Sequence, residues 1–179
     1  MWTLDKPRPV KLIVGVLAAD ARCLAAAREA IAAEFGAADF ISDVWPFGQT
    51  QYYQDQMGEH IVRQFVSMES LIGPGQLAGI KHRTNRVEQT LAAELAAGLP
   101  RPVNLDPGYI EPSKLVLAST KNFSHRIYIG DNMYAEVTLT FTRGTWVTYP
   151  YTYSDYQQKE YHDFFSRVRV RLVEQLKEV

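Results

Sequence analysis

The chain has 179 residues, of which 46% are hydrophobic, and 19 basic residues nearly balance 20 acidic ones, for a formal net charge of −1. This length and composition predict one domain, residues 1–179, with a full hydrophobic core. A protein that holds extended nucleic acid through phosphate contacts usually carries a basic excess. The near-zero charge therefore disfavours extended nucleic acid as a partner.

Three further features bear on where the protein works. Cys23 is the only cysteine, so an intrachain disulfide is excluded and a zinc cluster is not indicated. No apolar run reaches the roughly 18 to 20 residues that cross a bilayer. The first residues lack the basic start and long apolar stretch of a signal peptide. We therefore expect a cytoplasmic protein with no membrane partner.

The first half of the chain predicts alternating strands and helices. Residues 11–18 (KLIVGVLA) are almost all apolar, as in a buried strand. Asp20 is suited to cap a helix over 21–35, and Gly36 is suited to end it. Further strands are expected over 39–47 and 60–69, with a loop rich in Gln and Tyr between them, and a second helix from Gly73-Pro74 to about residue 97.

The second half is predicted to be mostly strand. Residues 98–112 contain four prolines and predict a long ordered loop or crossover. Strands are expected over 114–119, 127–129, 133–141 and 145–149, and a final helix with one apolar stripe from about residue 154.

This order of elements predicts an α+β fold with an antiparallel or mixed sheet. Its start would be a ferredoxin-like βαββα arrangement, with residues 116–119 as the next strand. An added antiparallel hairpin would extend the sheet, and the C-terminal helix would pack on it.

The densest group of chemically active side chains lies between two predicted strands, at residues 121–126 (KNFSHR). Arginine and lysine suit a phosphate or a carboxylate, so Lys121 and Arg126 are candidate anion ligands, with Ser124 beside them. Histidine exchanges a proton near neutral pH, which makes His125 a candidate acid. Strand alternation points His125 away from Ser124 and Arg126, so a half-buried structural role for His125 is the alternative.

Other candidates come from the second helix and the proline-rich segment. Lys81, Asn85 and Glu88 lie along one border of the helix's apolar stripe, where they line a pocket or form a solvated edge. Asp106 belongs to an Asp-Pro-Gly sequence that is sufficient as a turn, with a base or metal ligand as the functional alternative.

Acidic residues also lie inside or at the ends of predicted strands, where a charge needs a partner. They are Asp43, Glu69 and Glu136. Paired with the basic side chains above, they form a polar network that is structural, transfers protons or holds Mg²⁺ for a phosphorylated ligand. No spacing matches a transition-metal motif, so no metal ligands are assigned. Tyrosines over 149–156 either attach the last helix to the sheet or line a groove.

The chain resembles a bacterial family, domain-of-unknown-function family 4416, along almost its whole length. The residues that carry the resemblance are 42–47 (SDVWPF), 52–53 (YY), 65–69 (FVSME), 80–81 (IK) with 84–85 (TN) and 88 (E), 104–109 (NLDPGY), 118–121 (ASTK) with 124–126 (SHR), 135–137 (AEV), and 150–153 (PYTY) with 155–156 (DY). The family has no established activity, and some members carry the label GTP-binding protein. This chain has no GxxxxGK[ST] loop, so a P-loop GTPase is not supported. The resemblance implies that these residues form a site.

The first hypothesis is an enzyme or binder of a small phosphorylated, nucleotide-like ligand. The anion would be held by Lys81, Asn85, Lys121, Ser124 and Arg126. Asp106, Glu88 or Glu69 would act as base or metal ligand, and His125 as acid.

Two alternatives stay open. One is a non-catalytic interaction or regulatory module, in which the polar network is structural and aromatic residues form a partner or homo-oligomer surface. The other is a binder of RNA ends, which needs a contiguous basic patch. A ligand site predicts a concave pocket that joins both halves of the chain, whereas an interaction module predicts an exposed aromatic patch without such a pocket.

Overall fold

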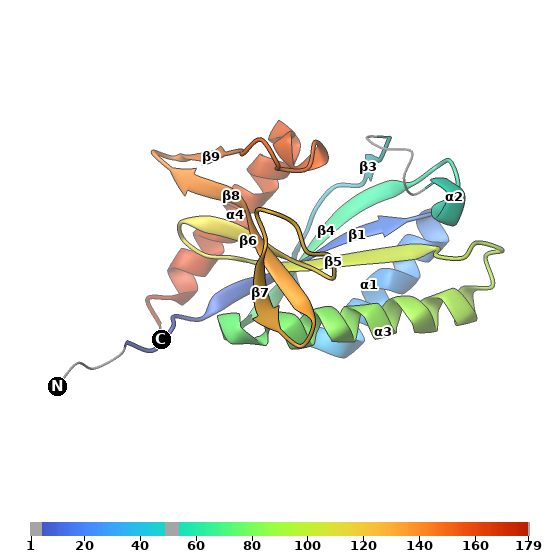
Figure 1. Cartoon of the computed structure of the whole chain (residues 1–179), viewed down its shortest axis with the longest axis horizontal. Coiled ribbons are helices and arrows are strands. Elements are labelled where there is room, and N and C mark those ends of the chain that lie inside the picture. The colour runs from blue at the N-terminus through green and yellow to red at the C-terminus, as the bar shows by residue number, and fades with distance from the viewer. Residues whose placement is uncertain (1–4, 49–53, 179) are drawn as a thin grey trace.

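The computed structural model describes residues 5–48 and 54–178, which form four helices and nine strands (Figure 1). In chain order they are β1 (Val10–Ala18), α1 (Ala21–Phe35), β2 (Ala38–Ile41), β3 (Trp45–Pro46), α2 (Gln54–Met57), β4 (Val62–Ile72), α3 (Leu77–Leu95), β5 (Val103–Ile110), β6 (Lys114–Ser119), β7 (Ile127–Gly130), β8 (Met133–Thr142), β9 (Thr145–Val147) and α4 (Lys159–Gln175). The predicted α+β class is confirmed.

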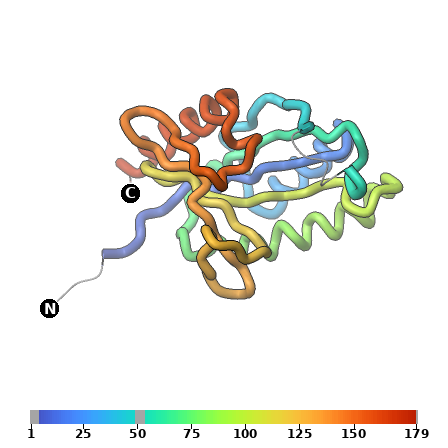
Figure 2. The backbone as a smooth tube through the Cα atoms, turned by 45° about the horizontal axis from the view of Figure 1, so that its top comes forward, coloured from blue at the N-terminus to red at the C-terminus, as the bar shows by residue number. Residues whose placement is uncertain are grey.

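All strands join one open sheet, in which every pairing is antiparallel. Its order is β2-β4-β1-β5-β6-β8-β7, with β3 beside β4 and β9 beside β8. Helices α1 and α3 cover one face of the sheet, and α4 covers the other (Figure 2). None of the helices in the described residues combines the length and the apolar composition of a membrane span.

Strand β1 forms the centre of the molecule because both of its faces are buried. Val14 and Val16 point into the core under α1 and α3, while Ile13 points into the core under α4. The alternation of side chains along a strand explains why the whole segment is apolar. Helix α1 begins and ends as predicted: Asp20 accepts a hydrogen bond from the backbone N–H of Cys23 at 2.7 Å, and Gly36 adopts a φ of 94°.

Two predicted strands have different bounds in the structure. The one expected over 39–47 is interrupted and forms β2 and β3, and the one expected over 60–69 is β4. The loop rich in Gln and Tyr includes residues 49–53, among them Tyr52 and Tyr53 of the resemblance, which lie outside the described residues.

The loop or crossover predicted over 98–112 is wrong, because that segment contains the central strand β5, which pairs with β1 along its whole length. Residues 116–119 therefore do not supply the strand beside β1; they belong to β6, one place further out. Proline argues against a central strand since it lacks an N–H. The nitrogen of Pro107 points to the edge of β5 that faces β6, and β6 pairs with β5 only from Gly108 onward. The missing N–H therefore costs no hydrogen bond between strands.

The separation of β5 from β6 shapes the site. The two strands pair only from Gly108 to Ile110, and the five earlier residues of β5 have no strand beside them on that side. At the crossing the backbones are so close that a Cβ on Gly108 would lie 2.3 Å from the carbonyl oxygen of Val116. Before Gly108 in the chain, β5 and β6 are separated, and the cleft forms between them.

Candidate functional site

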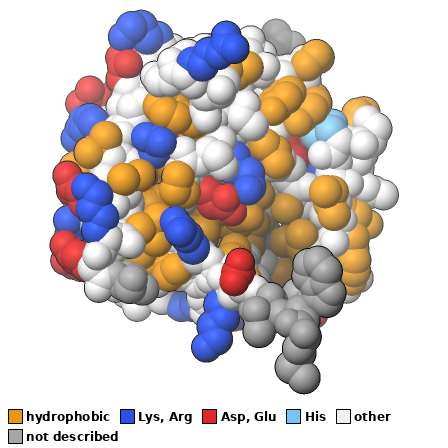
Figure 3. Space-filling view, turned by 90° about the vertical axis from the view of Figure 1, so that its left-hand side faces the viewer, with side chains coloured by type: hydrophobic (Ala, Val, Ile, Leu, Met, Phe, Trp, Pro, Cys, Tyr) orange, Lys and Arg blue, Asp and Glu red, His pale blue; other side chains and the backbone are white. Residues whose placement is uncertain are grey.

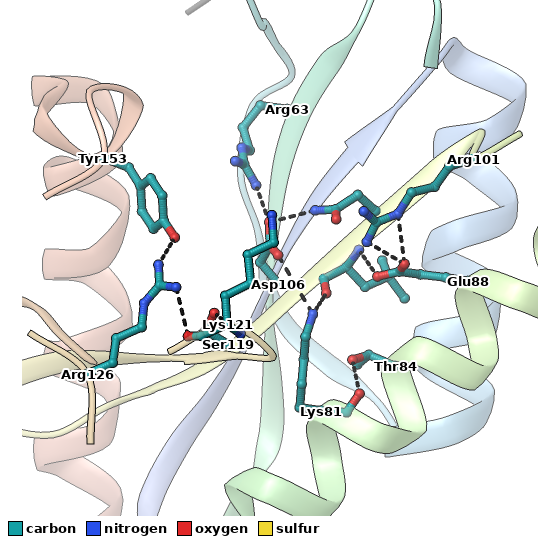
Figure 4. A network of polar contacts seen from close by, with 12 residues as sticks. Arg63, Lys81, Thr84, Glu88, Arg101, Asp106, Ser119, Lys121, Arg126 and Tyr153 are labelled. Carbon is teal, nitrogen blue, oxygen red and sulfur yellow. Dashed lines mark hydrogen bonds and ion pairs between the residues drawn. The ribbon is translucent and has the colours of Figure 1, made fainter. Parts of the chain in front are cut away.

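The opening in the sheet is a cleft of about 600 Å³ that joins residues from both halves of the chain. Arg63 and Lys81 reach it from the first half, and Lys121 and Arg126 reach it from the second. Figure 4 shows these side chains around Asp106 of β5. A concave pocket of this kind is what the ligand-site hypothesis predicts and what a pure interaction module does not require.

The cleft has a surplus of positive charge. Five basic side chains border it against three acidic ones, whereas the whole chain carries a net charge of −1. The basic ones are Arg63, Lys81, Arg101, Lys121 and Arg126, and the acidic ones are Asp106, Glu136 and Asp155. The excess is local, so it favours a small anion over an extended polyanion.

Arg63 of β4 is almost completely buried at the cleft, with 4% of its side chain exposed. Its guanidinium lies over three aromatic rings, 5.3 Å from the centre of Phe47, 5.5 Å from Phe65 and 5.7 Å from Tyr156. Gly15 of β1 leaves the space for this group, because a Cβ there would lie 3.0 Å from Nη1. Packing thus fixes the guanidinium in one place.

The hydrogen bonding of this guanidinium is incomplete. Nη2 donates to Oδ2 of Asp155 at 2.9 Å, across 92 residues of sequence. Burial raises the pKa of Asp155, and the attraction of Arg63 opposes that rise. Among the described residues, neither Nη1 nor Nε of Arg63 has a hydrogen-bond partner. Both atoms are themselves buried, and an unsatisfied buried donor costs roughly 1–3 kcal/mol. The guanidinium therefore holds a positive charge in the wall of the cleft that hydrogen bonds satisfy only in part.

Asp106 lies between cations without being hydrogen-bonded to them. Its Oδ2 is 3.6 Å from Nη1 of Arg63, and its Oδ1 is 3.8 Å from Nζ of Lys81. Asn104, two residues earlier on the same face of β5, donates to Oδ2 at 2.7 Å and orients the carboxylate. Asp106 therefore belongs to a strand and faces the cleft, and the Asp-Pro-Gly turn role considered for it is wrong.

Lys81 and Glu88 of α3 take the place of the missing strand beside β5. Nζ of Lys81 donates to the carbonyl oxygen of Leu105 at 2.8 Å, and Oε1 of Glu88 accepts from the N–H of Leu105 at 2.7 Å. Arg101 donates to Oε2 of Glu88 at 2.6 Å and 3.0 Å. Burial raises the pKa of Glu88, and Lys81 and Arg101 oppose that rise. Lys81 also borders the cleft, whereas Glu88 lies behind it.

Glu136 of β8 anchors the turn that contains the predicted anion ligands. Its Oε2 accepts from Nε of Arg126 at 2.8 Å and lies 3.1 Å from Nε2 of His125. Nη2 of Arg126 donates to the hydroxyl of Tyr153 at 2.6 Å (Figure 4). Burial raises the pKa of Tyr153 to about 12, so this hydroxyl is neutral at physiological pH. His125 itself is outside the cleft wall and stacks on Tyr151, with ring centres 4.1 Å apart.

Five of the nine predicted site residues do not border the cleft, and besides His125 and Glu88 these are Asn85, Ser124 and Glu69. Asn85 is half-buried on α3, one turn beyond Lys81, and Ser124 is exposed in the turn after β6. Glu69 lies near the end of β4 that is remote from Arg63, where its backbone carbonyl accepts a hydrogen bond from Lys11 at 3.1 Å. The cleft therefore unites Lys81, Asp106, Lys121 and Arg126 of the predicted set.

Sequence reasoning missed the most buried cation of the site, Arg63, and its partner Asp155. A signal was present: Arg63 is a basic residue inside a strand-like apolar run, where a charge needs a partner. Asn104 and Arg101 were missed because their segment was taken for a loop. Among the described residues, no group of three or more His, Cys, Asp or Glu side chains is close enough to hold a metal ion. Mg²⁺ stays a prediction that depends on the ligand.

Comparison with known families places the chain. The model of one family, a domain of unknown function (DUF4416), matches residues 8–171. The chain belongs to this family. The resemblance predicted from short segments is thereby confirmed over most of the sequence, and the family brings no assigned activity. No curated protein and no solved structure matches the chain.

Proposed function

We propose that the cleft binds a small phosphorylated, nucleotide-like anion, and that the protein acts as a binder of this ligand or as an enzyme upon it. The observation that carries the proposal is Arg63, a cation buried at the cleft whose Nη1 has no hydrogen-bond partner among the described residues. Lys81, Lys121 and Arg126 border the same space and add positive charge. A volume of about 600 Å³ lies within the range of small-molecule sites.

The roles of the cations differ. Arg63 would attract the anion through its charge, because its guanidinium is buried in the wall of the cleft. Arg126 holds Glu136 and Tyr153, so its main contribution is to position the wall of the cleft. Lys121 is exposed at the rim of the cleft, and its long, flexible side chain can adjust its position to contact a bound ligand. If the ligand reacts, Asp106 is the candidate base, since its carboxylate faces the cleft.

We expect thermal unfolding to detect this ligand. A panel of inorganic pyrophosphate, sugar phosphates and nucleotides, each with and without Mg²⁺, should contain a compound that raises the melting temperature of the wild type. At 100 times Kd the stabilisation is about 2.7 kcal/mol, or roughly 5 to 10 °C for a domain of this size. Lys121→Ala should weaken binding about tenfold, because one charged contact is lost.

Lys177→Ala is the matched control, since Lys177 is an exposed lysine on the turn after α4, outside the cleft. It should shift with the same compound as the wild type does. A flat panel for the wild type would contradict the proposal, and equal losses in both lysine variants would contradict the placement of the ligand.

One observation favours a partner surface as a second function. Strand β7 is at one edge of the sheet, and its side chains are apolar and exposed, with Ile127 72% and Tyr128 57% accessible. Phe123, just before it, is 63% accessible. Such an edge is suited to association, including a homo-oligomer. The surface lies outside the cleft, so both functions are compatible in one molecule.

Binding of RNA ends has less support. It requires a continuous basic patch, whereas basic and acidic side chains alternate among the described atoms on the face shown in Figure 3. Three carboxylates border the cleft together with its five basic side chains, so the cleft suits one small anion better than a chain of phosphates.

The fold also supports a finer description. The strand order β2-β4-β1-β5, with α1 and α3 on the same face, corresponds to a ferredoxin-like unit in which β5 is the fourth strand. We propose this unit as the scaffold of the protein. Strands β6 to β9 would then be the addition that supplies the second wall of the cleft.

A further inference from the structure

We propose that the ligand of the cleft is a phosphate ester with at least one free hydroxyl group, and that Asp106 accepts the hydrogen bond of this hydroxyl. The inference rests on the proposed function and adds to it the class of ligand. Three carboxylates border the cleft, and only that of Asp106 is substantially exposed to it.

Two of the three carboxylates are already engaged. Asp155 has 6% of its side chain exposed and accepts from Arg63. Glu136 has 1% exposed and accepts from Arg126 and Thr138, with His125 at 3.1 Å. Their oxygens stabilise the walls of the cleft and have little access to a ligand.

Asp106 differs from both of them. Its side chain is 27% exposed, and its Oδ1 makes no hydrogen bond to any of the described residues. Its orientation is nevertheless fixed, because Asn104 donates to Oδ2 at 2.7 Å. Arg63 and Lys81, at 3.6 Å and 3.8 Å, attract the carboxylate but are too distant for hydrogen bonds. A positioned acceptor therefore faces the cleft, and one of its oxygens makes no hydrogen bond within the described part of the chain.

An ionised carboxylate in an anion site restricts the ligand. It can only accept hydrogen bonds, and a phosphate oxygen beside it would be repelled. The repulsion is avoided if the phosphate lies toward Lys121 and Arg126, which also border the cleft, and another part of the ligand offers Asp106 a donor. An ammonium donor would lie next to Arg63 and Lys81 and be repelled in turn. A neutral hydroxyl meets both conditions.

Matched pairs of ligands test this inference by isothermal titration calorimetry. The pairs are glycerol 3-phosphate with n-propyl phosphate, and a nucleoside 5′-monophosphate with its 2′,3′-dideoxy form. Within each pair the phosphate is retained and hydroxyl groups are lost. Sites that hydrogen-bond a hydroxyl discriminate strongly against analogues that lack it. For the wild type we expect the Kd of the hydroxyl-free partner to be at least about tenfold higher.

Asp106→Ala should remove this discrimination and strengthen the binding of the hydroxyl-free ligand. The two members of a pair should then differ by less than about twofold, and n-propyl phosphate should bind more tightly than to the wild type, because a negative charge has left the site. Asp106→Asn retains the shape of the side chain and serves as a second variant in case alanine impairs folding. It should show the same tighter binding of n-propyl phosphate. Asp163→Ala, an exposed residue of α4, is the control and should behave as the wild type.

The outcomes separate this inference from the function it rests on. Binding of both members of each pair with equal affinity to the wild type would overturn the role of Asp106 and leave anion binding intact. Discrimination that persists in both Asp106 variants would overturn it as well. Failure of every phosphate compound and of pyrophosphate to bind would overturn the proposed function and this inference together.

Discussion

Replacing Arg63 with methionine is expected to lower the free energy of unfolding by about 3 to 5 kcal/mol and to abolish binding of phosphate compounds. The guanidinium is buried beside Asp155, whose side chain is 6% exposed, so its removal leaves a buried carboxylate without a partner. Urea unfolding gives the loss of stability, and calorimetry under native conditions gives the loss of binding. Both effects arise from one side chain because it stabilises the wall of the cleft and also supplies positive charge to it.

The double variant Arg63→Met/Asp155→Asn separates the two effects. Asparagine removes the uncompensated charge, so a substantial part of the lost stability should return. Binding should not return, because the donor is still absent. A single Arg63→Met variant that retained wild-type stability would contradict the buried ion pair, and one that retained wild-type affinity would contradict the anion site.

Replacing Gly108 with alanine is expected to destabilise the protein by about 3 kcal/mol or more, or roughly 10 °C in melting temperature. The added Cβ would lie 2.3 Å from the carbonyl oxygen of Val116 and 2.7 Å from Leu117. Backbone atoms at the crossing of β5 and β6 cannot move aside as a flexible side chain would. Because the two strands separate from this point to form the cleft, ligand binding should be lost together with stability.

Gly79→Ala is the matched control for this substitution. Gly79 is in α3, and a Cβ there would have open space around it. Alanine is favoured over glycine inside a helix, so this variant should gain about 0.5 to 1 kcal/mol. Thermal unfolding of the two variants side by side distinguishes a steric effect at the crossing from a general effect of replacing glycine. A Gly108→Ala protein as stable as the wild type would show that the strands cross at a greater distance.

The predictable parts of the fold are those with local signals. Helix α1 was predicted with correct bounds because Asp20 and Gly36 mark its ends and small apolar residues fill it. Strand β6 was predicted with correct bounds for the same reason, as a short apolar run between turn residues. Helices α3 and α4 follow from their apolar stripes, although each is preceded by a 3₁₀ turn that the sequence pattern included in the helix.

Strand β5 could not be predicted from its own residues. Its proline and glycine normally indicate a turn, and the pattern does not reveal that β6 separates from this strand at Gly108. Nor does it reveal that Glu88 and Lys81, from a distant helix, satisfy the unpaired backbone of Leu105. Long-range packing decided the structure of this segment.

For the site as well, the sequence predicts groups of residues that are close in the chain, but not those that only folding brings together. Lys121 and Arg126 are close in sequence and were assigned together, and the structure brings them to one cleft. Arg63 and Asp155 are 92 residues apart, and only the folded chain joins them. Glu69 belongs to the predicted strand, but it lies toward the end of β4 that is remote from the cleft. A sequence pattern predicts that a strand is present but not which of its ends lies beside the site.

The most direct test of the anion cleft is a titration of isotope-labelled protein with pyrophosphate and with ribose 5-phosphate, followed by the NMR signals of backbone amides and arginine side chains. We expect saturable shifts at the Nη and Nε groups of Arg63 and at the amides of residues 104, 106, 119–121, 126 and 153–156, which border the cleft. Residues of α1, none of which borders the cleft, should be unaffected. Shifts that are absent at millimolar ligand, or that gather away from Arg63, would contradict the account.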